Sequence, residues 1–160
     1  MNVFTSIDDK VLKLPNGQLV EPEKLEKEIG RICHYVHHVA LAVKDGKYLV
    51  AMIFPNKTLF SNPDYEISPE EGCFCPRNLK ELGKCLSGCM HTINLKLLPG
   101  YAKINSAVIV NTELSLTDGT LTTDLNIIPA NVIKIYKDHL KNLFGEKIPV
   151  KEEVFNMNFS

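Results

Sequence analysis

The chain has 160 residues, the usual length of one domain with a substantial hydrophobic core and too short for two domains of full size. Its 18 Lys and Arg residues nearly balance 19 Asp and Glu residues, leaving a formal net charge of -1, so no broad positive surface for nucleic acid is expected. Hydrophobic residues make up 44% of the chain, yet no apolar run approaches the roughly 20 residues that cross a bilayer, which excludes a membrane span.

The first predicted elements are a β-hairpin and a helix. Residues 11–14 and 18–20 are short, mainly apolar stretches on either side of Asn16-Gly17, a dipeptide typical of tight hairpin turns. Pro22 suits the first position of a helix, and apolar residues follow it at helical spacing. A helix over about 22–32 is therefore predicted.

Two strands and a loop are predicted next. Residues 36–43 and 48–54 are largely apolar, and the turn-forming residues 44–47 between them favour antiparallel pairing. Residues 55–72 are rich in Pro, Asn, Ser and acidic side chains, which indicates a surface loop.

The second half of the chain is predicted to begin and end with a helix. An amphipathic helix follows Pro76 and runs to about residue 93, although Gly83 and Gly88 weaken it. A strand at 107–110 and a polar loop at 117–124 come next. Apolar residues at helical spacing then mark a closing helix: Ile133, Tyr136, Leu140 and Phe144.

Together these elements predict an α+β fold. It consists of an N-terminal β-hairpin followed by a small three-stranded sheet, antiparallel or mixed, packed with about three helices. A fold class of this kind does not by itself define a function.

Several segments, in order along the chain, carry a resemblance to a known family. Residues 8–26 are similar to a hinge followed by an Asn-Gly hairpin, a Val-x-Pro step and a Glu-rich helix. Residues 48–56 and 101–110 are similar to two of the family's strands, and residues 114–126 to a loop that usually ends Leu-Thr-Pro-Thr-Leu-Lys. The chain thus resembles the C-terminal lid subdomain of AMP-forming acyl-CoA synthetases, in the long-chain fatty acyl-CoA and feruloyl-CoA branch of the adenylate-forming enzymes.

The resemblance implies a division of the chain and a partner. Residues 1–10 correspond to a hinge remnant, 11–145 to the lid domain and 146–160 to a loosely ordered tail. In the family, a large N-terminal domain binds ATP and the carboxylic acid, and the lid rotates between an adenylating pose and a pose for transfer to CoA. An N-terminal adenylation domain, in the same chain or another, is therefore the expected partner. ATP with magnesium and CoA would serve the complete enzyme, whereas the isolated chain is expected to hold no cofactor and to be inactive.

Position by position, the resemblance assigns roles near the N-terminus. Asp9 falls on the hinge position, which absorbs the dihedral change of domain rotation. Asn16 and Gly17 fall on the hairpin that lines the path of the CoA arm, and Gly17 also suits the turn. Ser6 and Ile7 depart from the family, which has glycine and arginine at those positions.

Asn126 falls on the catalytic lysine of the family. A neutral amide cannot supply the positive charge that stabilises the adenylation transition state, so this position is expected to be inactive. Lys103 and Lys134 are alternative sources of charge, although nothing in the sequence supports either. A second hypothesis is a stand-alone, non-catalytic binding or regulatory module derived from such a lid.

The cysteines offer a weaker, competing hypothesis of metal binding. Their spacing is unusual for zinc, and buried or free thiols are the favoured interpretation of Cys73, Cys75, Cys85 and Cys89. His37 and His38 are expected to point to opposite faces of their strand, which argues against a shared ion. The odd number of cysteines, five, and an N-terminus without the features of a secretory signal predict reduced thiols and a cytoplasmic location.

Overall fold

A mixed five-stranded sheet is the centre of the fold. The computed structural model describes residues 3–7, 10–32, 35–55, 79–97 and 100–159, with the Ile32 side chain left aside. The strand order is β1-β4-β5-β6-β7, in which β5 and β6 are parallel and the other neighbours antiparallel. The five strands are β1 (Phe4–Ser6), β4 (Val36–Lys44), β5 (Tyr48–Pro55), β6 (Ile104–Val110) and β7 (Val154–Asn158). A separate two-stranded hairpin consists of β2 (Leu12–Lys13) and β3 (Leu19–Val20).

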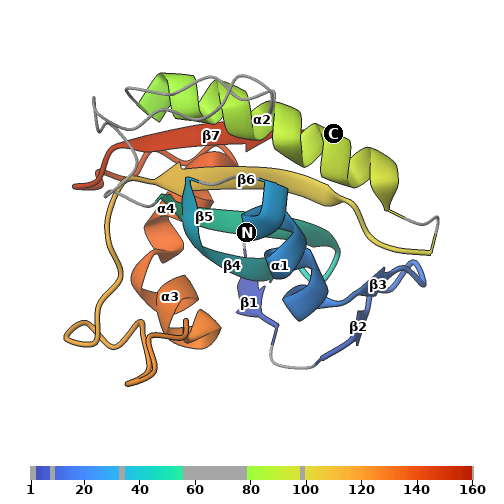
Figure 1. Cartoon of the computed structure of the whole chain (residues 1–160), viewed down its shortest axis with the longest axis horizontal. Coiled ribbons are helices and arrows are strands. Elements are labelled where there is room, and N and C mark those ends of the chain that lie inside the picture. Colours follow the sequence, from blue (N-terminus) through green and yellow to red (C-terminus); the bar gives the residue numbers. More distant parts are fainter. Residues whose placement is uncertain (1–2, 8–9, 33–34, 56–78, 98–99, 160) are drawn as a thin grey trace.

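Helices cover both faces of the sheet (Figure 1). Successive residues of a strand point to opposite faces, and β4 divides accordingly between two hydrophobic cores. Val39, Leu41 and Val43 belong to the core beneath α1 (Pro22–Ile32) and α2 (Leu79–Lys96). Ala40 and Ala42 belong to the core beneath α3 (Pro129–Ile135) and α4 (Lys137–Leu143). Because β5 is buried on both faces, its sequence is a continuous apolar run rather than an alternation.

The α+β class and several elements are confirmed. The hairpin forms around Asn16-Gly17, a helix occupies Pro22–Ile32, and β4 pairs antiparallel with β5 as predicted. The amphipathic helix α2 is present and connects the parallel strands β5 and β6. Its buried stripe includes Leu82, Leu86 and Met90.

The main sheet has two edge strands that the sequence analysis did not predict. Residues 4–6, expected to belong to a hinge remnant, form β1 and pair with β4. The prediction of a loosely ordered tail at 146–160 is wrong for Val154–Asn158, which forms β7 and pairs with β6. Met157 is buried in the core beneath α1 and α2, and the burial of this apolar side chain stabilises β7.

The predicted closing helix is divided in two at Tyr136. That residue has φ -102° and ψ 23°, outside the α-helical range, and it ends α3 and precedes α4. The apolar periodicity continues across the break because Ile133, Tyr136 and Leu140 all reach the same core. Periodicity alone therefore could not show the interruption.

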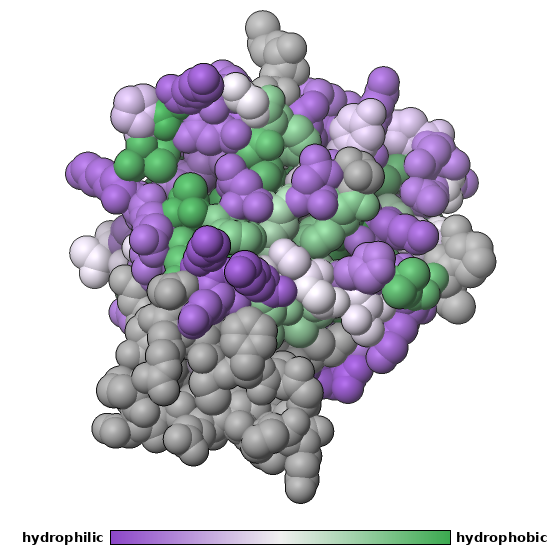
Figure 2. Space-filling model, turned by 90° about the horizontal axis from the view of Figure 1, so that it is seen from above, coloured by the Kyte–Doolittle hydropathy of each residue, from purple (hydrophilic) through white to green (hydrophobic). Residues whose placement is uncertain are grey.

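Apolar side chains reach the surface of the described part of the chain at several positions. On the face seen from above, hydrophilic side chains predominate among the coloured residues, and hydrophobic side chains reach the surface in the centre and at several places around it (Figure 2). Leu95, on α2, is the large apolar side chain with the highest exposure among the described residues, at 69%. None of the helices described has the length and apolar character that crossing a membrane requires.

Candidate functional site

The β2–β3 hairpin presents an open glycine at its tip. The Leu14 amide donates to the Gln18 carbonyl at 2.8 Å, and the Gly17 amide donates to the Leu14 carbonyl at 2.8 Å. The Asn16 side chain closes the turn by accepting a hydrogen bond from the Gln18 amide at 2.9 Å. Gly17 has φ +89°, and no atom lies within 4 Å of the position that a Cβ would take. The turn geometry therefore favours glycine here, and the space beside it is free.

Backbone and side-chain hydrogen bonds fasten this hairpin to the segment before β6. The Leu19 amide donates to the Gly100 carbonyl at 2.8 Å, and the Ala102 amide donates to the Leu19 carbonyl at 2.9 Å. The Tyr101 hydroxyl donates to Glu21 Oε1 at 2.6 Å. This hydrogen bond holds the pKa of the Glu21 carboxyl below its usual value. The position of the hairpin is thus defined by three contacts to one short segment.

A groove of about 390 Å³, with both polar and apolar residues in its wall, lies beside the hairpin. Its basic lining residues are Lys47, His91 and Lys103, and none of the described residues that line it is a carboxylate. We call it the hairpin groove, with these residues and Asn16, Gln18, Tyr48, Asn94 and Asn105 in its wall. Asn94 is buried and bonded in both directions to Ile104, donating at 3.0 Å and accepting at 2.9 Å. The groove can hold an anion, since the charged side chains among its described lining residues are cationic.

Asn126 lies in a different part of the molecule, in a tight exposed loop before α3. The Thr122 amide donates to the Asn126 carbonyl at 2.8 Å, and the Asn126 amide donates to Thr122 Oγ1 at 3.1 Å. Leu125 is 60% exposed and has φ +63°, a conformation uncommon for a residue other than glycine. The Asn126 side chain is exposed and neutral, so it presents no charge to a phosphate.

The structure does not bring the hairpin and the Asn126 loop together. They lie toward opposite ends of the long axis of the molecule, with the loop at lower left and the hairpin at lower right (Figure 1). Lys103 lines the hairpin groove and so belongs to the hairpin end. Lys134 is exposed on α3, the helix that follows the Asn126 loop. The two regions can therefore contribute to the same site only together with a partner domain, or in succession after a domain movement.

The remaining candidates contribute little to a site. Asp9, Cys73 and Cys75 lie outside the described residues. Cys85 and Cys89 are half-buried on α2. Within the described ranges, no group of three or more His, Cys, Asp or Glu side chains is placed to hold a metal ion.

The expectation that His37 and His38 point to opposite faces is wrong. Their rings stack with centroids 4.2 Å apart. The register between β4 and β5 shifts between Val36 and His38, and such an irregularity breaks the alternation of side chains. Burial, with a smaller effect of the neighbouring His37, lowers the pKa of His38 to about 4, which keeps this imidazole neutral at pH 7.

A part of several solved adenylation-domain structures has the same fold as this chain. No protein-family model matches this chain, and no curated protein matches it. The chain is similar to an A-PCP didomain of carboxylic acid reductase from Segniliparus rugosus in complex with AMP, with TM-score 0.61 and 20% identity over 85% of this chain and 17% of that one. It is also similar to the adenylation domain of a carboxylate reductase from Mycobacterium chelonae, with TM-score 0.59 and 17% identity over 86% of this chain and 20% of that one.

A third neighbour is the A domain of the Segniliparus rugosus reductase in complex with AMP and a co-purified carboxylic acid. Its TM-score is 0.54 and its identity 20%, over 84% of this chain and 20% of that one. The chain therefore has the fold of a part of these adenylate-forming domains and spans between 17% and 20% of their length. At these identities the likeness shows the fold.

Two features of the hairpin region were missed by the sequence analysis. The Glu21–Tyr101 hydrogen bond joins residues 80 positions apart, and no local pattern indicates it. Lys47, His91 and Lys103 come from a turn, a helix and a strand entry, so only the fold gathers them. The similarity of residues 101–110 to a family strand was the one signal pointing to this segment.

Proposed function

We propose that this chain is the lid of an AMP-forming carboxylate–CoA ligase. The observation that carries the proposal is the structural similarity between 85% of this chain and 17% of the A-PCP didomain of a carboxylic acid reductase. The order of the acyl-CoA synthetase motifs along the sequence supports the CoA-dependent branch. The substrate is then a carboxylic acid, activated with ATP and magnesium on an N-terminal adenylation domain in the same chain or a separate one. A cytoplasmic location remains part of this proposal.

The hairpin groove supports a role in the second half of such a reaction. In the first half, the carboxylate attacks the α-phosphate of ATP and pyrophosphate leaves. In the second half, the sulfur of CoA attacks the acyl carbon, its proton passes to solvent, and AMP leaves with the C–O bond electrons. Gly17 offers a narrow arm free space, and Lys47 and Lys103 can face phosphate groups at the same end of the molecule.

Asn126 should slow the adenylation half-reaction more than the transfer half-reaction. A lysine at this position would place a compact positive charge on the exposed loop, where a phosphate could be reached. The asparagine cannot, so we expect weak adenylation and retained transfer from an acyl-adenylate that is already formed.

A chimera tests both parts of the proposal. The chain is fused to the N-terminal domain of a long-chain acyl-CoA ligase whose own lid has been removed, and thioester formation is measured from ATP and from a preformed acyl-adenylate. We expect transfer from the adenylate well above that of the lidless domain. Asn126→Lys should raise the rate from ATP by about 10²-fold. Thr123→Lys, which adds the same charge at another exposed position of the loop, should change it little.

A pair of glycine variants tests the hairpin. Gly17→Leu should lower acyl transfer by about tenfold or more, because the side chain occupies the free space at the tip. Gly145→Leu is the matched control, since Gly145 also has positive φ, +98°, with no atom near its Cβ position. Equal losses in both variants, or transfer no better than that of the lidless domain, would contradict the proposed function.

The neutral Asn126 also favours a second candidate, a non-catalytic binding module derived from a lid. In that case the chain by itself binds CoA through the hairpin groove. Titration of the isolated chain with CoA distinguishes the two functions. Saturable binding that Lys103→Glu weakens, together with no transfer in the chimera, would favour the binding module.

A further inference from the structure

The β2–β3 hairpin lies outside the main sheet. Its strands have two residues each and form a separate two-stranded sheet. A two-stranded hairpin is marginally stable by itself, so its position depends on the segments that contact it. Leu14 and Val20, which are 4% and 2% exposed, anchor its base in the core beneath α1 and α2. Backbone hydrogen bonds of Leu19 to Gly100 and Ala102 attach β3 to the segment before β6.

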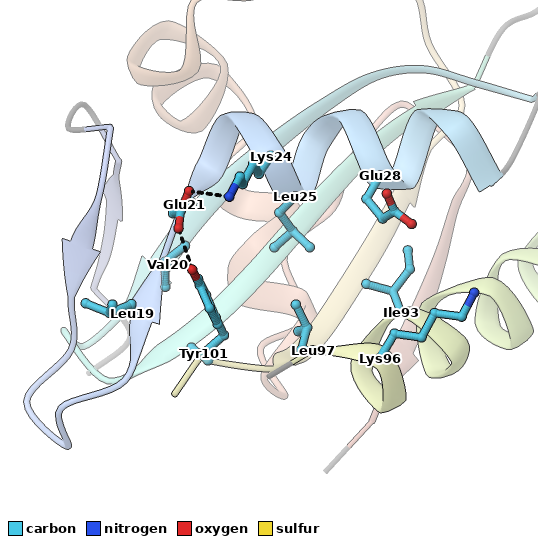
Figure 3. A pocket seen from close by; sticks show the side chains of 11 residues that line it. Leu19, Val20, Glu21, Lys24, Leu25, Glu28, Ile93, Lys96, Leu97 and Tyr101 are labelled. Carbon is cyan, nitrogen blue, oxygen red and sulfur yellow. Dashed lines mark hydrogen bonds and ion pairs between the residues drawn. The ribbon is translucent and has the colours of Figure 1, made fainter. Parts of the chain in front are cut away.

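One side-chain contact joins the same two segments. The Tyr101 hydroxyl, from the segment before β6, donates at 2.6 Å to Oε1 of Glu21, the residue that follows β3 (Figure 3). This distance is typical of a hydroxyl that donates to an ionised carboxylate, which is one of the stronger kinds of hydrogen bond in proteins. The same hydrogen bond is the main cause that holds the pKa of Glu21 below its usual value, so the carboxylate is ionised at pH 7. We call this interaction the Glu21–Tyr101 contact.

The two segments that this contact joins also form two walls of the hairpin groove. The hairpin provides one wall, with Leu14, Asn16 and Gln18. The segment after Tyr101 provides another, with Ala102, Lys103, Ile104 and Asn105. Glu21 and Tyr101 themselves do not line the groove. Their hydrogen bond therefore joins the two walls from outside the groove.

Other contacts of the two residues do not account for this hydrogen bond. Glu21 lies 3.4 Å from Lys24, but the Lys24 side chain is 78% exposed, and ion pairs of that kind contribute little. A carboxylate just before α1 also suits the helix dipole, which explains an acidic residue without a hydroxyl partner. Tyr101 lines a pocket between α1 and α2, a role that a phenylalanine ring would fill equally well. The hydroxyl group of Tyr101 is thus explained by its contact with Glu21.

We propose that Glu21 and Tyr101 are positioning residues, whose hydrogen bond sets the width of the hairpin groove and thereby the affinity for CoA in acyl transfer. This inference rests on the proposed function, in which Gly17 and Lys103 face the CoA arm and its phosphates. Gly17 belongs to one of the joined segments and Lys103 to the other. Without the hydroxyl the two segments can move apart, so CoA would meet fewer of its contacts at one time. The acyl-adenylate is bound by the N-terminal domain, so its binding should not depend on the Glu21–Tyr101 contact.

Amide hydrogen exchange in the whole chain measures the attachment of the hairpin without any ligand. The Leu19 and Ala102 amides donate across the junction between the hairpin and the segment before β6. Tyr101→Phe should raise the exchange rate of both amides by about tenfold, because a hydrogen bond to an ionised group is lost beside them. Amides of β5, inside the main sheet, should change by about twofold or less.

Tyr136→Phe is the matched control for the loss of a hydroxyl group. Tyr136 belongs to the core beneath α3 and α4, and its hydroxyl is hydrogen-bonded to Thr112. The substitution therefore removes the same group and one hydrogen bond, on the other face of the sheet. We expect the Leu19 and Ala102 amides to exchange in this variant as they do in the wild type.

The chimera with the N-terminal domain of a ligase measures the consequence for transfer. With a preformed acyl-adenylate as the other substrate, Tyr101→Phe should raise the KM for CoA by about five- to tenfold and leave the KM for the acyl-adenylate within about twofold. Glu21→Ala, which removes the acceptor, should have the same effect, and Glu21→Gln, which keeps an acceptor, a smaller one. A purely structural defect would impair both substrates alike, as a loss of active enzyme does. Tyr136→Phe should leave both KM values within about twofold.

Two further variants separate the hydrogen bond from the other roles of Glu21. In Tyr101→Phe combined with Glu21→Ala, the KM for CoA should be no higher than in either single variant, because both remove the same hydrogen bond. Lys24→Met removes the ion pair of Glu21 and keeps the hydrogen bond, so exchange and KM should stay within about twofold of the wild type.

Three results would overturn the proposal. The first is unchanged exchange of the Leu19 and Ala102 amides in Tyr101→Phe, or an equal acceleration in β5. The second is an unchanged KM for CoA, or an equal rise in Tyr136→Phe. The third is a double variant in which the effects of the two substitutions multiply. An inactive chimera of the unaltered chain would instead contradict the proposed function itself, and would leave the Glu21–Tyr101 contact with a role in folding alone.

Discussion

Two glycines of α2 show how one residue type serves different purposes. Gly88 has open space at its Cβ position, whereas a Cβ on Gly83 would overlap the ring of Phe155 on β7. The sequence analysis treats both glycines as positions that weaken the helix. In the structure, Gly83 lets α2 lie close against β7, and this long-range contact has no local sequence signal.

Substitutions at these two glycines should therefore have opposite signs. Gly83→Ala should destabilise the fold by about 1–3 kcal/mol, because the Phe155 ring or the helix has to move. Gly88→Ala should stabilise it by up to about 1 kcal/mol through helix propensity. Urea unfolding of the two variants and the wild type measures both changes. Equal effects would show that α2 and β7 are not in close contact.

Glu26 on α1 has a half-buried carboxyl group that binds its proton more tightly than an exposed glutamate does. Burial, with a smaller contribution from Glu23, raises the pKa of Glu26 to about 7. The pKa in the folded state therefore lies above 4.5, the ordinary value for a glutamate. This group therefore favours the folded state at acid pH, and its contribution is lost as the pH rises from about 4.5 to about 7.

Glu26→Gln should remove the destabilisation that arises at high pH from burying the ionised carboxylate. At pH 8 the variant is expected to be more stable than the wild type by about 1–3 kcal/mol, and at pH 4 the two should be nearly equal. Urea unfolding at both pH values tests this, with Glu153→Gln at an exposed position as the control. A Glu26→Gln gain that is the same at pH 4 and pH 8 would rule out the raised pKa as its cause.

At the scale of elements, the sequence predicted what depends on local order and missed what depends on distant partners. The Asn16-Gly17 hairpin, α1 and the β4–β5 pair rest on turn residues and periodicity, and all three are present. β1 and β7 are short edge strands that pair with segments far away in the chain, so no local pattern reveals them. For the candidate site, the hairpin was predicted, but the groove and its lysines required the fold.

Strand β7 can be tested through two neighbouring residues. Met157 is 4% exposed and belongs to the core, whereas Asn156 beside it is exposed. Met157→Ala should cost about 2–5 kcal/mol, and Asn156→Ala should stay within about 0.5 kcal/mol. Thermal unfolding followed by circular dichroism gives both values. If the tail were loosely ordered, neither substitution would have a measurable effect.

For the molecule as a whole, the shared sheet is the feature that joins the two cores. Strands β4, β5 and β6 contribute alternate residues to both cores. Unfolding of these strands would therefore disrupt both cores together. The sequence could not reveal this arrangement, because Leu86 and Leu140 look alike as apolar positions on amphipathic helices. Only the topology assigns them to opposite faces of the sheet.

One cooperative unfolding transition is the expected consequence. Leu86→Ala and Leu140→Ala each empty a fully buried position, in different cores, and each should lower the free energy of unfolding by about 2–5 kcal/mol. Leu95→Ala, at a position that is 69% exposed, should have little effect. In every variant, unfolding by urea should show one midpoint by circular dichroism and by tyrosine fluorescence, since Tyr35 and Tyr136 report on different cores. Two midpoints, with Leu140→Ala moving only one of them, would mean that the α3–α4 face, which follows the Asn126 loop, unfolds independently of the hairpin face.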